Sequence, residues 1–129
     1  MDEPVDLTDP QIWLELAANK LDHARQIFEI GLYDDAISRA YYALFYAAKA
    51  ALLTKGLNLR KHSSTVAKFS ELFVSTGEVE REYVRYLSQA QGARELSDYA
   101  PFVKTSREGA LEMLNAAEAF ISRIKQLIE

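Results

Sequence analysis

Small side chains recur every three or four positions in the middle of the chain, from residue 36 to residue 50. A spacing of this kind places them on one stripe of an α-helix, where the backbone of a neighbouring helix can approach closely. The stripe consists of Ala36, Ala40, Ala43, Ala47 and Ala50. Three tyrosines and an arginine lie in the same segment. The pattern predicts a helix at the centre of a bundle that also carries polar groups into it.

Glycine and proline residues divide the chain into further helical segments. Asp9 followed by Pro10 is a favoured helix start, and we expect the first helix to run from there to about Ile30, before Gly31. The other expected helices run from near Asp34 to before Gly56, from Ser63 or Ser64 to before Gly77, from about Val79 to Asp98, and from a cap at Thr105 or Ser106, with Glu108 placed for a capping box on Thr105.

The expected fold class is all-α. No segment alternates polar and apolar residues for long enough to predict a β-strand. Short connections between helices favour antiparallel neighbours, so we expect an up-and-down bundle of about five helices. The 129 residues suit a single domain over residues 1–129 and are too few for two ordinary domains.

Composition narrows the function classes. The sequence has no cysteine, which excludes disulfides and thiolate metal sites and suits a reducing compartment. A net charge of −4 argues against nucleic-acid binding over the whole surface but allows a local basic patch. The longest nearly apolar run, from Ala40 to Leu53, is interrupted by Lys49 and is too short for a membrane span. We see no signal peptide, and the expected location is the cytoplasm.

An arginine extends the apolar stripe of the expected fourth helix. Arg94 lies on the helix face that also carries Tyr83, Leu87 and Ala90. A guanidinium there needs a partner or a wet cleft, and Asp98 is one turn further along. Two interpretations stay open: a structural ion pair between Arg94 and Asp98, or a cleft with Arg94, Asp98 and Tyr99 that recognises phosphate.

The second expected helix has its own basic and aromatic strip. Arg39, Tyr42, Tyr46 and Lys49 follow one another at spacings of three, four and three, so they share one side of the helix. Such a strip can stack on a base and hold a phosphate. The alternatives are a surface salt bridge between Asp35 and Arg39, and tyrosine hydroxyls anchored at the edge of the bundle.

A basic loop precedes the third expected helix. Lys61 and His62 lie directly before Ser63, and the free backbone N–H groups of a helix start can bind an anion. The alternative is a capping loop with solvated charges. We therefore keep Lys61 and His62 as candidate binding residues.

Three segments together resemble the HEPN domain, and more narrowly the small stand-alone HEPN proteins of archaea and bacteria. They are Gly31 through Lys49, then Lys61-His62-Ser63 opening a helix that carries Phe69, then Arg94 through Tyr99. The resemblance implies a homodimeric antiparallel bundle. It also implies a nucleotidyltransferase partner, because such proteins are often encoded beside a minimal nucleotidyltransferase as a toxin–antitoxin pair. Many of them hold an Arg-x4-6-His motif of a metal-independent ribonuclease in the dimer cleft.

The sequence departs from that motif at the histidine. Arg94 matches the arginine, but the position after four intervening residues is Tyr99, and no histidine follows. Tyrosine titrates near pH 10 and is a poor general base. The resemblance therefore favours a module that binds RNA or a nucleotide. The alternative is a ribonuclease in which Arg94 contacts phosphate while His62 or Tyr99 moves protons. Tyr99 is also our candidate if a cleft tyrosine is modified.

No cofactor or metal is expected. A di-iron bundle needs Glu-x-x-His pairs, but Lys20 and Leu59 stand three residues before the two histidines. No glycine-rich phosphate loop is present either. We expect the homodimer to bury the edges that carry Arg39 and Arg94 around a shared groove.

Overall fold

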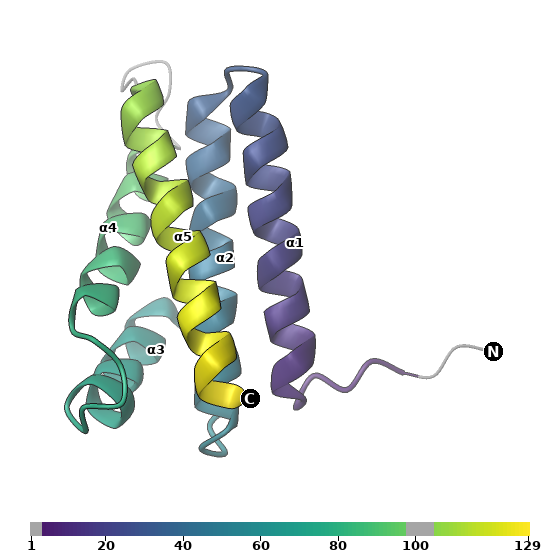
Figure 1. The fold of residues 1–129 in the computed structure, drawn as a ribbon, viewed down its shortest axis with the longest axis vertical. Coiled ribbons are helices and arrows are strands. Elements are labelled where there is room, and N and C mark those ends of the chain that lie inside the picture. The colour runs from purple at the N-terminus through teal and green to yellow at the C-terminus, as the bar shows by residue number, and fades with distance from the viewer. Residues whose placement is uncertain (1–3, 98–104) are drawn as a thin grey trace.

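A computed structural model describes residues 4–97 and 105–129, and its ordered elements are helices. They are α1 (Pro10–Glu29), α2 (Tyr33–Leu53), α3 (His62–Phe69), the π-helical turn η1 (Ser70–Val74), α4 (Glu82–Ser97) and α5 (Arg107–Ile128). The long helices α1, α2 and α5 lie side by side, α4 lies on the side away from α1, and α3 lies toward one end of the bundle (Figure 1). Successive long helices run in opposite directions. The predicted all-α antiparallel bundle is confirmed.

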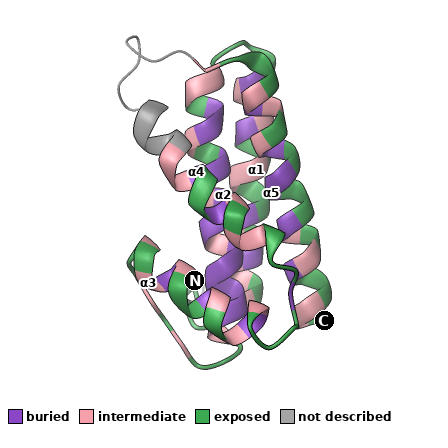
Figure 2. Cartoon of the chain, turned by 90° about the vertical axis from the view of Figure 1, so that its left-hand side faces the viewer, coloured by how far each residue is buried: buried purple, intermediate pink, exposed green. Residues whose placement is uncertain are grey.

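Helix α2 is the centre of the bundle. It packs against α1, α3, α4 and α5. All members of the alanine stripe are fully buried, and Figure 2 shows buried residues along most of the length of α2. The small side chains let the neighbouring helices approach, as expected from their spacing. No helix in the described ranges combines the length and the apolar character that a membrane crossing requires.

Local capping explains where α1 and α5 begin. The Asp9 side chain accepts a hydrogen bond from the backbone N–H of Gln11 at 2.9 Å, and Pro10 occupies the first turn, as predicted. At α5 the cap is Ser106, whose Oγ accepts from the Gly109 N–H at 3.0 Å. The predicted cap at Ser106 is therefore confirmed, and the capping box expected on Thr105 is wrong. Gly31 adopts a φ of 84°, a conformation that glycine tolerates after a helix end.

The third helix is not the single regular helix that the sequence predicts. After Phe69 the backbone widens into η1, where the Ser75 N–H donates to the Ser70 carbonyl at 2.9 Å. The rings of Phe69 and Phe73 stack at 5.2 Å and are 0% and 1% exposed. Both rings thus lie in the core.

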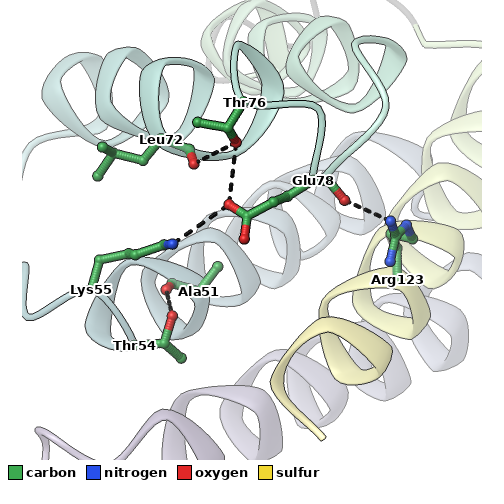
Figure 3. A network of polar contacts seen from close by, with 7 residues as sticks. All are labelled: Ala51, Thr54, Lys55, Leu72, Thr76, Glu78 and Arg123. Carbon is green, nitrogen blue, oxygen red and sulfur yellow. Dashed lines mark hydrogen bonds and ion pairs between the residues drawn. The ribbon is translucent and has the colours of Figure 1, made fainter.

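Polar contacts join the connection between η1 and α4 to α5 and to the end of α2. Arg123 of α5 donates from Nη2 to the Glu78 carbonyl at 2.7 Å and from Nε to the Glu80 carboxylate at 2.9 Å. The Glu78 carboxylate in turn accepts from Thr76 at 3.2 Å and lies 3.5 Å from Lys55 Nζ (Figure 3). These contacts hold the connection over the buried Val79.

Candidate nucleic-acid interface

Rings from three helices form a continuous row, which we call the aromatic row. Its members are Trp13 of α1, Tyr41, Tyr42, Phe45 and Tyr46 of α2, and His62 of α3. Ring centroids lie 5.3 Å apart for Trp13 and Tyr46, 5.9 Å for Tyr46 and Tyr42, and 4.9 Å for Tyr42 and Tyr41. The row thus connects the start of α1 to the start of α3 across α2.

The helices fix the row at each end. His62 lies 5.3 Å from the Tyr41 ring and stacks on Phe45 at 5.8 Å, two rings that are one turn apart on α2. At the other end, the Trp13 indole N–H donates to the Leu7 carbonyl at 2.8 Å. His62 is therefore oriented by contacts with α2, and Trp13 by a contact with the segment before α1.

Positive charges surround the aromatic row. Arg39 is exposed on α2, and Arg60 and Lys61 are exposed on the connection to α3. Lys49 is 8% exposed, and its Nζ lies 4.2 Å from the centroid of the Trp13 ring. The strip expected from the spacing of Arg39, Tyr42, Tyr46 and Lys49 is thus present, with its tyrosines half-buried and its lysine buried.

The structure bears on two alternatives that the sequence left open, the salt bridge on α2 and the capping loop before α3. The salt bridge between Asp35 and Arg39 is wrong, because both side chains are exposed and no ion pair joins them in the described ranges. Their position on the outer face of α2 lets each be hydrated separately. Lys61 is solvated and gives no side-chain cap to α3, although its carbonyl accepts from the Thr65 hydroxyl at 2.7 Å. His62, in contrast, is half-buried against the rings.

Burial changes the pKa of two side chains at the aromatic row, Tyr46 and Lys49. Burial, with a smaller effect of Tyr42, raises the pKa of Tyr46, so its hydroxyl stays protonated at neutral pH. Burial, followed by the positive charge of Arg60, lowers the pKa of Lys49. The Lys49 ammonium therefore lies where positive charge is disfavoured. In the part of the chain that is described, no three potential metal ligands gather at one place.

The second candidate region is the C-terminal part of α4. Leu87 and Ala90 are fully buried and Tyr83 is half-buried, which confirms this part of the predicted stripe. Arg94 belongs to α4, but its side chain lies outside the described residues, as do Asp98 and Tyr99. The ion pair and the phosphate cleft at these residues both stay predictions.

Sequence reasoning missed two members of the site. Trp13 and Arg60 are not among the candidate residues that the sequence predicts. The contact between Trp13 and Tyr46 joins two helices, so no spacing of residues within one helix predicts it. The one available signal was Lys49, the only charge within an otherwise apolar run.

Comparisons with known proteins agree on one family. A family model described as HEPN domain matches residues 10–127. A Methanocaldococcus jannaschii protein named "Putative toxin MJ0605" is 40% identical over 119 residues, covering 92% of this chain and 88% of that protein. A Thermotoga maritima protein named "UPF0332 protein" is 35% identical, covering 92% and 90%. The crystal structure of TT1696 from Thermus thermophilus has a TM-score of 0.75 at 22% identity over 91% of this chain and 96% of that one, a likeness in fold alone.

Proposed function

This chain belongs to the HEPN domain family, and from that premise we propose that it is a toxin-type module that binds RNA or a nucleotide. We further propose that it acts in the cytoplasm as a homodimer and pairs with a minimal nucleotidyltransferase. Two M. jannaschii relatives, at 40% and 32% identity, carry toxin names, which supports the toxin part of the proposal.

The observation that carries the proposal is the aromatic row with its surrounding cations. Single-stranded RNA offers unpaired bases that stack on aromatic side chains and phosphates that attract Lys and Arg. Tyr42 and Tyr46 offer half-buried rings, while Arg39 and Lys61 offer solvated charges beside them. The net charge of −4 therefore does not prevent a local pairing of rings with cations.

Binding is favoured over cleavage by the chemistry of the available side chains. The motif position that a histidine fills in many family members is Tyr99 here. The remaining candidate for proton transfer, His62, is half-buried against Tyr41 and Phe45. An imidazole packed in this way is better suited to stacking than to rapid proton exchange with a substrate. Ribonuclease activity is therefore the result that would replace the binding proposal.

Fluorescence polarization with a short labelled single-stranded RNA tests the proposal. We expect wild-type protein to bind, and we expect Arg39→Gln, Tyr42→Leu and Arg94→Gln to weaken binding, each by about tenfold. Lys125→Gln is the control, because Lys125 is an exposed cation on α5 outside the site. No binding by the wild type would refute the proposal, and equal loss in the control would remove this face from it.

Two further measurements separate the parts of the proposal. Incubation of the RNA with wild-type protein in chelator, followed by electrophoresis, should leave it intact, whereas cleavage would identify a metal-independent ribonuclease. Copurification with the nucleotidyltransferase encoded nearest in the genome should give a stable complex. Absence of that complex would remove the partner but not the RNA.

A further inference from the structure

We infer that Lys49, Arg60 and Trp13 form a phosphate-binding site at the α1 end of the aromatic row. The site would take the phosphate of a nucleotide or of an RNA strand, with the neighbouring rings available to the base. The inference deepens the proposed function by naming the group that is recognised. It rests on that function, which is the binding of RNA or a nucleotide.

The first step is the uncompensated charge of Lys49. The residue is 8% exposed, and no carboxylate of the described ranges lies within ion-pair distance of its ammonium. Burying a charge without an opposite charge costs free energy, so buried ammonium groups are normally paired. The position therefore lacks a counter-charge that an anionic ligand can supply.

The second step is the part played by Trp13. Its ring lies 4.2 Å from the Lys49 Nζ and is itself held by the Leu7 carbonyl and by Tyr46. An aromatic face attracts a cation through its quadrupole, but it carries no net charge. Trp13 thus orients the ammonium without neutralising it.

The third step is a second cation. Arg60 is exposed on the connection between α2 and α3, two residues before His62, whose ring stacks on Phe45 one turn before Lys49 on α2. Its positive charge adds to the effect of burial in lowering the pKa of Lys49. Two like charges disfavour each other unless an anion lies between them. A phosphate offers several oxygens that accept charge-assisted hydrogen bonds from an ammonium and a guanidinium together.

Another lysine in the same chain shows the ordinary arrangement. Lys55 also lies over an aromatic ring, with its Nζ 5.3 Å from the centroid of Phe73. It is exposed, however, and Glu78 lies 3.5 Å from it. Lys55 therefore has the counter-charge that Lys49 lacks, and it provides a matched control.

The sequence supplies a reporter at the proposed site. Trp13 is the only tryptophan among the 129 residues, so intrinsic tryptophan fluorescence reports on this place alone. The probes are inorganic phosphate, adenosine 5′-monophosphate, uncharged adenosine, and a short single-stranded RNA. We expect saturable changes with phosphate and with the nucleotide, and none with adenosine. A tighter change with RNA than with the nucleotide would identify the strand as the source of the phosphate, and the reverse would identify the free nucleotide.

Variants assign the change to the two cations. Lys49→Met keeps the length of the side chain and removes its charge. Arg60→Gln removes the charge at an exposed position. We expect each to weaken phosphate or nucleotide binding by about tenfold or more, and Lys55→Met to leave it unchanged. Circular dichroism verifies that each variant is folded.

Three results would overturn the site. They are no saturable change with either phosphate probe, an equal loss in Lys55→Met, and a response to an acidic peptide but not to phosphate. The outcome is separable from the proposed function. RNA binding that depends on Arg39 and Arg94 without a phosphate response would refute this site alone. A response to inorganic phosphate without binding of RNA or of the nucleotide would refute the proposed function alone.

Discussion

Lys49 shows at the scale of one residue how a group in a proposed binding site can cost stability. Its ammonium is buried beside Trp13 without a carboxylate, and both burial and Arg60 lower its pKa. A lysine whose folded pKa lies below its usual 10.5 releases its proton more easily in the native state than in the unfolded chain. The charged form therefore destabilises the fold at neutral pH. That cost is relieved as the pH rises through the folded pKa toward 10.5.

We expect Lys49→Met to raise the free energy of unfolding by on the order of 1 kcal/mol at neutral pH, because it removes a desolvated charge and keeps the volume. The gain over the wild type should shrink as the pH rises toward the usual pKa of lysine. Urea denaturation at about pH 7 and about pH 10 measures both effects. A variant less stable than the wild type at neutral pH would mean that the contact with Trp13 outweighs the burial cost.

Glu80 behaves in the opposite sense. Hydrogen bonds from Arg123 are the largest cause that lowers the pKa of this carboxyl below its usual 4.5. Its stabilising effect is therefore present above pH 4.5 and is lost as the pH falls through the folded pKa. We expect Arg123→Gln to flatten this part of the acid limb in a plot of unfolding free energy against pH. Glu80→Gln serves as the reference, because it removes the titrating carboxyl. If the acid limb of Arg123→Gln equals that of the wild type, the contact between Arg123 and Glu80 does not contribute to the loss of stability in acid.

At the scale of the elements, helix ends follow local chemistry. Ser106 caps α5 through the Gly109 N–H, which would otherwise lack a partner. Ser106→Ala should lower the free energy of unfolding by about 1 kcal/mol. Ser122→Ala is the control, because Ser122 is exposed within the same helix. Thermal denaturation of both variants checks the difference, and equal midpoints would contradict the role of the cap.

The same scale shows what the sequence could and could not predict. The helices, their antiparallel order and the central place of α2 follow from caps and periodicity, which are properties of neighbouring residues. The π-helical turn follows Phe69, which stacks on Phe73 and packs 5.4 Å from Phe120 of α5. The contact of Trp13 with Tyr46 likewise joins separate helices. Such contacts are set by tertiary packing, so no local pattern reveals them.

At the scale of the whole molecule, the helices divide into a scaffold and a face for which we propose binding. The alanine stripe lets α1, α4 and α5 close around α2, and the aromatic row crosses from α1 over α2 to α3. The predicted homodimer would place two such faces around a shared groove. Light scattering at micromolar concentration should give twice the monomer mass of 14.6 kDa, and a monomer would contradict the groove.

The most direct test of RNA binding by this face is the dependence of affinity on salt. Each phosphate contact releases counterions, so affinity should fall steeply as salt rises. Arg39→Gln and Lys61→Gln should each reduce the slope of log affinity against log salt by about one, whereas Lys125→Gln should leave it unchanged. Polarization titrations over a salt series measure the slope. Binding whose slope is the same in all of these variants would contradict the proposed face.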